Sequence, residues 1–348
     1  MKIHSVKIQN FLKFKKLIIL SCLFVFMFYI YSIYNPRRDT SIYLEHDKNE
    51  LTTLGYRANR IDRILYHLRW WIDPSFKYAR DMYVSDLKID IVIPLIEKDM
   101  DTAVYTIQSV RKLVMHPIGK IFIVGPNRPK LIEFSKKNDC VFVDEALVID
   151  KFDVVKKYGG WIIQQFIKLS MEKIVEQDHY LVVDADTIFL RPQIFYDNGK
   201  YLVNTHWMCT MGRKIFSNNI IKNDKIWLLD FVTHNMLFSK NILSELKKRI
   251  ENLHAKPWNL AILDQGKNYN IRFFSEYELY MTYLTELSGA DYQFVSNANM
   301  TVHRNSFFGV DEIIRAYAND YKSISLHHFI LRPMIENRSI TEGLQKDK

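Results

Sequence analysis

From residue 88 onward, short apolar segments alternate with helical ones, and this alternation constrains the fold more than any other feature. The apolar segments are IDIVIPL (89–95), KIFIVGP (120–126) and CVFVDE (140–145), with helices expected at 102–114 and 130–138 between them. Strands of this kind, separated by helices, form parallel sheets whose two faces are covered. The sequence therefore predicts an α/β fold with a Rossmann-type, mostly parallel sheet and flanking helices.

One apolar segment runs directly into a pair of acidic residues. A helical stretch at 160–175 precedes HYLVVDADTIF, which begins at His179 and reaches Asp184 and Asp186. In open parallel sheets, ligands bind at the carboxyl ends of the strands. The acidic pair is therefore predicted to lie at the ligand-binding edge of the sheet.

The pattern is looser beyond Arg191-Pro192. Strands are expected at 201–204, 231–238 and 323–327, and helices at 240–253 and 276–287.

Asp184 and Asp186 have the spacing of a cation site. They are one residue apart, so at an extended strand end both side chains project to one side. Carboxylate oxygens suit Mg²⁺ or Mn²⁺, and a cation bridging two phosphates neutralises charge as a diphosphate leaves. The alternative is a turn, where aspartate is common. Four apolar residues, 180–183, precede the pair, and because ionised carboxylates beside a buried strand need a partner, a metal site is favoured.

The segment YLVVDADTIFLRP (180–192) resembles the Asp-x-Asp segment of GT-A-type glycosyltransferases, the nucleotide-diphospho-sugar transferase superfamily. IDIVIPL resembles their first nucleotide-binding strand, and GWIIQQFIKLS (160–170) resembles the helix before Asp-x-Asp. HNMLFSK (234–240) and FSEYELY (274–280) resemble segments of a poorly characterised subgroup. The resemblance extends over about residues 89 to 330, and we expect the enzyme domain to occupy residues 89–340.

The resemblance implies a GT-A-like fold and a metal-dependent glycosyltransferase that uses Mn²⁺ or Mg²⁺. Its donor would be a nucleotide sugar such as a UDP- or GDP-sugar, and its acceptor a glycan, a protein or a lipid. The part beyond residue 192 would supply the acceptor pocket. Inversion and retention of the anomeric centre both stay open, because the fold supports either outcome.

Several donor-site residues are implied by the same resemblance. Lys168 lies where a basic residue often reaches the donor phosphates or sugar, although a solvated lysine is the alternative. Gln164 and Gln165 can hydrogen-bond hydroxyls, as ordinary helix-surface glutamines also can. Asp144, which ends CVFVD, resembles the acid that contacts the nucleoside, and Pro94 lies where the base would stack. A strand-end aspartate is also a common turn or cap residue.

Two glutamates are candidates for the catalytic base. An inverting transferase needs a carboxylate that takes the proton of the acceptor hydroxyl, and FSEYELY offers Glu276 and Glu278. Ser275-x-x-Glu278 has the pattern of a capping box, in which Glu278 folds back on the backbone. Glu276 is therefore predicted as the base, although either glutamate could instead complement the helix dipole.

Three histidines are further candidates. In several GT-A families a C-terminal histidine completes the metal sphere, and His327-His328 ends a predicted strand in the corresponding region. Adjacent strand residues point oppositely, so at most one would bind metal, and His328 is predicted as that ligand. A structural histidine is the alternative. His234 is assigned to the acceptor site.

The head of the chain has the pattern of a membrane anchor. Residues 17–34, LIILSCLFVFMFYIYSIY, carry no charge and span about 27 Å at ~1.5 Å per residue. Five lysines precede the run and both charge signs follow it, which places the N-terminus in the cytosol. A cleaved signal peptide and a buried core helix are the alternatives, but the run is followed by Asn35-Pro36-Arg37-Arg38 rather than a small-x-small site.

This pattern predicts a single-pass type II membrane protein. Its parts are a cytosolic tail (1–16), a signal anchor (17–34), a stem (35–88) with a helix near 58–71, and an enzyme domain that is lumenal (Golgi or ER) or extracytoplasmic. Asn299 and Asn337 begin glycosylation triplets that would be usable there.

Charge argues against a nucleic-acid-binding protein. The net charge is +9, but residues 1–88 carry 15 Lys and Arg against 8 Asp and Glu, whereas the rest carries 33 against 31. A basic nucleic-acid face belongs on the folded domain rather than beside an apolar run. The 3 cysteines form no disulfide framework, although Cys140 and Cys209 could pair.

Two other functions are open. A membrane-tethered binding or scaffold protein could keep the fold without turnover. A nucleotidyltransferase should have a Gly-rich loop after its first strand, and residues 95–99, LIEKD, contain no glycine.

Overall fold

A five-stranded sheet forms the centre of the fold in the computed structural model, which describes residues 83–206, 210–227, 229–303, 315, 317–318 and 321–327. The strand order is β3-β2-β1-β4-β8. The strands are β1 (Ile89–Pro94), β2 (Ile118–Gly125), β3 (Val141–Asp144), β4 (His179–Val183) and β8 (Asn235–Ser239). Strands β1 to β4 are parallel and β8 runs antiparallel to β4. The predicted mostly parallel α/β sheet is confirmed.

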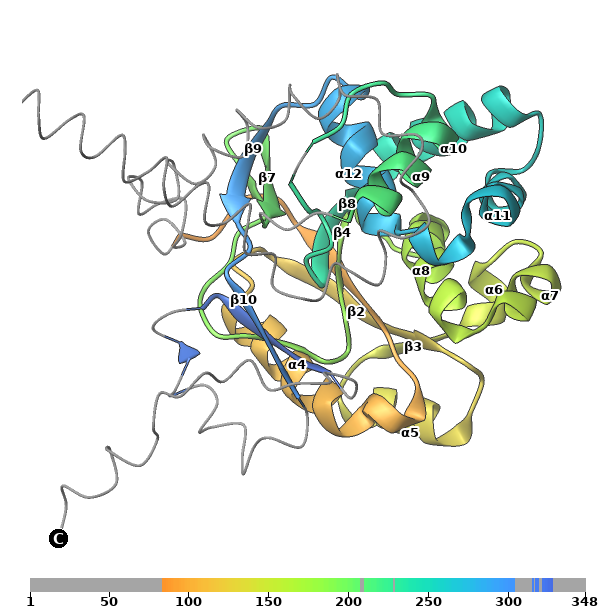
Figure 1. Cartoon of the computed structure of the whole chain (residues 1–348). Coiled ribbons are helices and arrows are strands. Elements are labelled where there is room, and N and C mark those ends of the chain that lie inside the picture. The colour runs from red at the N-terminus through yellow and green to blue at the C-terminus, as the bar shows by residue number, and fades with distance from the viewer. Residues whose placement is uncertain are drawn as a thin grey trace, which may run out of the picture. The chain divides into compact units, whose positions relative to one another are not determined.

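Helices cover both faces of this sheet, as Figure 1 shows, with α4 and α5 on one side and α8 on the other. Helix α4 (Met100–Leu113) joins β1 to β2, and α5 (Pro129–Lys137) joins β2 to β3. Helix α8 (Gly160–Ser170) precedes β4 and ends in a 3-10 turn at Met171–Lys173. Between β3 and β4 the chain moves from the face covered by α4 and α5 to the face covered by α8. It does so because β4 lies on the far side of β1, so the chain must return from the edge strand β3 past β2 and β1.

The remaining helices gather at the α8 side (Figure 1). Two short ones follow β3, and four longer ones belong to the second half of the chain. They are α6 (Glu145–Val148), α7 (Phe152–Val155), α9 (Met211–Ile221), α10 (Lys240–His254), α11 (Trp258–Tyr269) and α12 (Glu276–Glu286).

Two three-stranded sheets flank the carboxyl end of β4. One has the order β10-β11-β5, and the other has the order β6-β7-β9. Their strands are β5 (Thr187–Phe189), β6 (Tyr196–Asp197), β7 (Lys200–Thr205), β9 (Tyr292–Ser296), β10 (Asn299–His303) and β11 (Ser323–His327). Since Ser325 pairs with Thr187 and the Leu326 amide donates to the Asp186 carbonyl at 2.9 Å, the end of β11 meets the acidic pair.

The second half differs from its sequence-based expectation in three respects, the first being that strands β6, β9 and β10 were not expected. The strand expected at 231–238 begins only at Asn235, because His234 adopts a left-handed backbone conformation with φ 64°. Helices α9 and α11 were not expected. The α9 sequence, MGRKIFSNNII, contains Gly, Ser and two Asn, which are poor helix formers, and its buried Phe216 and Ile220 show that packing stabilises it.

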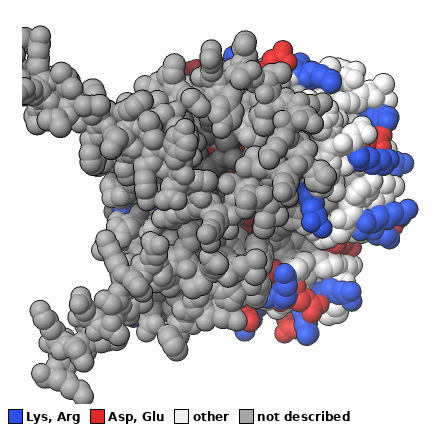
Figure 2. All heavy atoms as spheres, in the orientation of Figure 1, with Lys and Arg blue, Asp and Glu red and all other residues white. Residues whose placement is uncertain are grey.

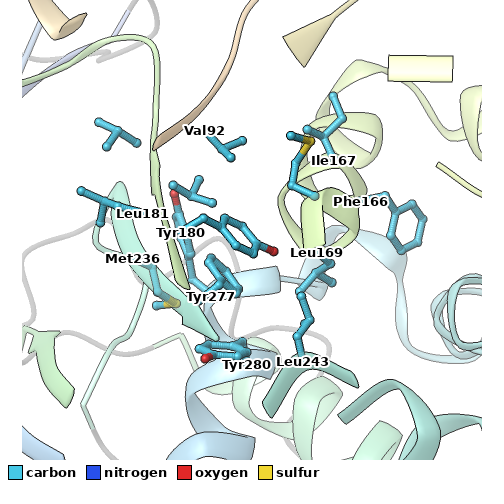
Figure 3. Packing of buried hydrophobic residues seen from close by; sticks show 14 of the residues in the cluster. Val92, Phe166, Ile167, Leu169, Tyr180, Leu181, Met236, Leu243, Tyr277 and Tyr280 are labelled. Atoms are coloured by element: carbon cyan, nitrogen blue, oxygen red, sulfur yellow. The ribbon is translucent and has the colours of Figure 1, made fainter. Parts of the chain in front are cut away.

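Aromatic residues fill the core between the sheet and α12 (Figure 3). The Phe238 ring lies 4.4 Å from that of Tyr280 and 5.4 Å from that of Tyr180, measured between centroids. Both tyrosine hydroxyls are satisfied, since Tyr180 donates to the Lys168 carbonyl and Tyr280 accepts from the Ser239 amide, each at 2.8 Å. This packing ties α8, β4, β8 and α12 into one rigid support at the end of β4.

Several predicted features lie outside the described residues. They are the anchor at 17–34, the stem helix near 58–71, Cys209, His328 and Asn337. Within the described part of the chain, no helix is both long and apolar enough to span a membrane.

Candidate functional site

Asp184 follows β4 directly and is held by three side chains from distant parts of the chain. Its Oδ1 accepts from Lys168 Nζ at 2.6 Å and from the Tyr277 hydroxyl at 3.1 Å, and its Oδ2 accepts from His234 Nδ1 at 3.1 Å. Burial alone would raise the pKa of Asp184, but Lys168 and His234 hold it well below its ordinary value. Asp184 is therefore ionised and fixed in orientation.

Lys168, near the end of α8, neutralises two carboxylates. Its ammonium is 2.6 Å from Asp184 Oδ1 and 2.7 Å from Glu276 Oε1, and it lies 4.3 Å from the centroid of the Tyr277 ring. Burial alone would lower the pKa of Lys168, but Asp184 and Glu276 raise it well above its ordinary value. A charged lysine that is buried among protein groups positions carboxylates, whatever further contact it makes with a donor.

Asp186, two residues on, has a different environment. Burial, together with the charges of Asp184 and Asp99, raises the pKa of Asp186 to about 6, although His234 opposes the shift. His327 Nδ1, at the end of β11, is 3.5 Å from Asp186 Oδ2. The two aspartates thus differ, because only Asp184 contacts a buried ammonium.

The environment of Asp186 fits a divalent cation. A half-buried carboxylate beside two other carboxylates is stabilised when a positive charge lies next to it. Asp186 offers oxygen and His327 offers nitrogen, both of which Mn²⁺ accepts. Among the described residues, no group of three or more His, Cys, Asp and Glu side chains is arranged to hold a metal ion. The two protein ligands of this pair would leave coordination positions to a second ligand.

Glu276 and Glu278 both lie buried at the start of α12, and each contacts a lysine from another helix. Glu276 contacts Lys168, whereas Glu278 Oε1 accepts from Lys214 Nζ at 2.5 Å. The Glu278 amide donates to Ser275 Oγ at 3.3 Å, as a capping box requires. The side chain of Glu278 does not fold back on the backbone, because Lys214 neutralises it. The sequence-based reason for preferring Glu276 as the base is thereby removed, and its role stays a prediction.

Gln164 and Gln165 differ in their surroundings. The Gln165 side chain is buried, and its Oε1 accepts from the Glu276 amide at 3.2 Å, which caps the first turn of α12. Within the part of the chain that is described, its Nε2 has no hydrogen-bond partner. Gln164 is half-buried on α8.

The two predicted nucleoside contacts lie along the same edge of the sheet as Asp184. Pro94 ends β1, the neighbour of β4, and Asp144 ends β3 at the sheet edge. With adjacent strands about 4.8 Å apart, β3 lies about 14 Å from β4. Asp144 Oδ1 also accepts from the Ala146 amide at 2.9 Å, so it caps α6. A ligand reaching both Asp144 and Asp186 would have to extend across three strand spacings.

A second polar cluster was not predicted from the sequence. His206 and Asp230 pair through two backbone hydrogen bonds of 3.1 and 2.8 Å, and His206 Nε2 is 3.8 Å from Asp230 Oδ2. Arg213 NH1 is also 3.8 Å from Asp230 Oδ2. His206 interacts electrostatically with His234, which connects this cluster to Asp184. The three residues occur in separate segments without a motif, so the sequence contains no signal that groups them.

Residues 86–312, well over half of the chain, match a family described as a family of unknown function (DUF6492). This chain belongs to that family. In this DUF6492 member, the matched range includes both aspartates and Lys168, whereas β11 with His327 lies beyond it. No curated protein sequence matches the chain.

Solved structures similar to this DUF6492 protein include two named as glycosyltransferases and one named as a sugar-phosphate synthase. Mouse xyloside xylosyltransferase 1 in its apo form is 12% identical with a TM-score of 0.42, covering 69% of this chain and 97% of the other. Galactosyltransferase LgtC with donor and acceptor sugar analogues is 11% identical with a TM-score of 0.38, covering 68% and 87%. Glucosyl-3-phosphoglycerate synthase from Mycobacterium tuberculosis with Mn²⁺, UDP and phosphoglyceric acid is 12% identical with a TM-score of 0.40, covering 64% and 75%. Similarity at this level of identity and TM-score decides nothing about activity.

Proposed function

We propose that this protein is a metal-dependent glycosyltransferase that moves a sugar from a nucleoside-diphosphate sugar to a glycan, protein or lipid acceptor. One observation carries the proposal. At the carboxyl end of β4, the half-buried carboxylate of Asp186 is not neutralised by Lys168, and it lies beside His327 and the firmly held Asp184. A cation that also binds a diphosphate would complete this charge arrangement.

Asp186 and His327, with Asp184, would hold Mn²⁺ or Mg²⁺. When bound, the cation supplies positive charge that stabilises the leaving diphosphate. Lys168 and His234 keep Asp184 ionised, and the hydrogen bond from Tyr277 helps to fix its orientation. Pro94 and Asp144 are proposed to contact the nucleoside, and Gln164 and Gln165 the donor sugar. His328 lies outside the described residues, and because at most one of the two adjacent histidines can bind the metal, His327 is proposed in its place.

The full-length chain in detergent micelles, offered a panel of UDP- and GDP-sugars with Mn²⁺ or Mg²⁺, tests the proposal. We expect turnover of one donor, its loss in EDTA, and a fall of at least about 100-fold in Asp186→Ala. Asp224→Ala removes an exposed carboxylate outside the site and should leave turnover unchanged. Full activity of Asp186→Ala or of the EDTA-treated enzyme would refute the metal mechanism. No turnover with any donor would favour a membrane-tethered, non-catalytic protein.

We also propose that residues 17–34 anchor the protein as a single-pass type II membrane protein. The uncharged run and the lysines before it support this topology. Protection of the C-terminus from protease in sealed membrane vesicles is the expected result, and release of the chain by alkaline carbonate would contradict it.

A further inference from the structure

The polar cluster of His206, Asp230 and Arg213 contains an unequal pair. The Asp230 side chain is only 6% exposed, whereas that of His206 is 36% exposed. The Val232 amide donates to Asp230 Oδ1 at 2.7 Å, which fixes this carboxylate, and its Oδ2 faces His206 Nε2. A buried, fixed carboxylate 3.8 Å from a more exposed imidazole acts on it through its charge, which favours uptake of a proton by the histidine.

The cluster lies next to the proposed donor site. Asp230 begins the five-residue segment 230–234 that leads into β8, and His234, at its end, hydrogen-bonds Asp184. His206 follows β7 directly and is held against this segment by the backbone bridge to Asp230. Both histidines are therefore placed by the strands that support the end of β4.

The charges around His206 favour its neutral form. Burial lowers the pKa of His206, Asp230 raises it, and the neighbouring His234 and Arg213 lower it further, while a hydrogen bond with the Val232 backbone raises it. The result is a pKa below the ordinary histidine value. The neutral imidazole keeps one ring nitrogen with a lone pair, which can take up a proton.

We propose that His206, held beside the charged Asp230 by their backbone bridge, takes the proton of the acceptor hydroxyl, an inference that rests on the proposed transferase function. In this step the acceptor oxygen forms a bond to the anomeric carbon of the donor sugar. The bond from that carbon to the diphosphate oxygen breaks, and its electron pair leaves with the nucleoside diphosphate. The hydroxyl proton moves to His206. Because the displacement is direct, the product has the inverted anomeric configuration.

The test compares pH profiles in the full-length protein. The donor identified in the panel is supplied with p-nitrophenyl glycosides as acceptors, or with water alone. The ratio kcat/KM is measured from about pH 5 to about pH 9 at saturating Mn²⁺, so that protonation of Asp186 does not limit the rate. His206→Asn should lower kcat by about 100-fold or more and remove the acidic limb of the profile. Its Kd for the nucleoside diphosphate, measured by calorimetry, should not change, and product NMR should show inversion.

Two neighbouring substitutions should move the acidic limb in opposite directions. Asp230→Asn removes the charge that raises the pKa of His206, so the limb moves to lower pH. Arg213→Gln removes a charge that lowers this pKa, so the limb moves to higher pH. His254→Asn is the matched control and should behave as wild type. His254 ends α10, and its side chain hydrogen-bonds the carbonyl of Ile220 on α9. These two shifts decide the question even where His206→Asn fails to fold.

Three outcomes overturn the inference. His206→Asn turns over at the wild-type rate, or the product retains the donor's configuration, or the acidic limb is lost in Glu276→Gln and kept in His206→Asn. The last result would assign the proton to Glu276. A wild-type protein that turns over no donor would instead refute the proposed function, and the inference with it.

Discussion

Lys168 is the residue on which the charge balance of the site depends. It contacts Asp184 and Glu276 within 2.7 Å, and both carboxylates are largely buried. Removing one partner of a buried ion pair leaves an uncompensated charge, which costs about 3–5 kcal/mol. We therefore expect Lys168→Met to lower the free energy of unfolding by about this amount, measured by urea denaturation.

The matched control for this change is Lys130→Met on α5, where the side chain is 76% exposed. It should change the free energy of unfolding by less than about 0.5 kcal/mol. Adding Glu276→Gln to Lys168→Met should recover part of the loss. An unfolding midpoint of Lys168→Met equal to wild type would show that these carboxylates do not need the ammonium.

Lys322 is a second buried lysine, and it makes stability depend on pH. Its Nζ donates to the Ser296 carbonyl at 2.8 Å, and burial, with a smaller effect of Arg191, lowers its pKa from 10.5 to about 8. The unfolded chain therefore binds more protons than the folded one between about pH 8 and 10.5, so this contribution to stability rises through that window.

Lys322→Met should remove this pH dependence. Below about pH 8 the variant avoids burying a charge and should be more stable than wild type by up to about 3 kcal/mol, a difference that shrinks towards pH 10.5. Urea denaturation of both proteins at a series of pH values measures it. A stability difference that stays constant across this series would be inconsistent with the lowered pKa.

At the scale of elements, the pairing of β1 with the start of β2 requires a glycine at position 119. The buried Asp90 of β1 accepts from the amides of Lys120, Glu176 and Gln177 at 2.8, 2.7 and 3.0 Å, which ties β1 to β2 and to the turn before β4. A Cβ added at Gly119 would meet Asp90 Oδ1 at 2.3 Å. Gly119→Ala should therefore displace this carboxylate and cost about 1–3 kcal/mol, measured by urea denaturation.

Gly160→Ala provides the comparison for Gly119→Ala. Gly160 begins α8, and a Cβ there would meet no atom within 4 Å. Alanine should be neutral or stabilising by up to about 1 kcal/mol. Equal losses in both variants would show that the clash with Asp90 is not the cause.

The order of elements was largely predictable, and the exceptions have identifiable causes. Apolar periodicity correctly predicts strands β1 and β4 and helix α4. The residues that each of these elements buries recur at regular intervals within its own short segment. The start of β8 was not predictable from periodicity, since the left-handed His234 is imposed by its contacts with Asp184. Helix α9 was missed because its stability comes from packing rather than from propensity.

At the scale of the whole molecule, cation binding should couple to stability. A ligand at about 100 times its Kd that binds only the folded state adds about 2.7 kcal/mol. Mn²⁺ with a nucleoside diphosphate should therefore raise the melting temperature of the full-length protein, and Asp186→Ala should abolish the increase. Nucleoside diphosphate without metal should give little change. An undiminished increase in Asp186→Ala would place the cation elsewhere.

The sequence by itself determined the parallel sheet and the position of Asp184 and Asp186 at its ligand-binding edge. Both follow from local patterns. Short, almost continuously apolar segments predict buried parallel strands, and the acidic pair directly follows the apolar segment 180–183. What only the tertiary structure decided is the different state of the two aspartates. Lys168, His234, Tyr277 and His327 come from four distant segments, and charge interactions act through space. No spacing along the chain therefore encodes which of the two carboxylates contacts the buried ammonium and which does not.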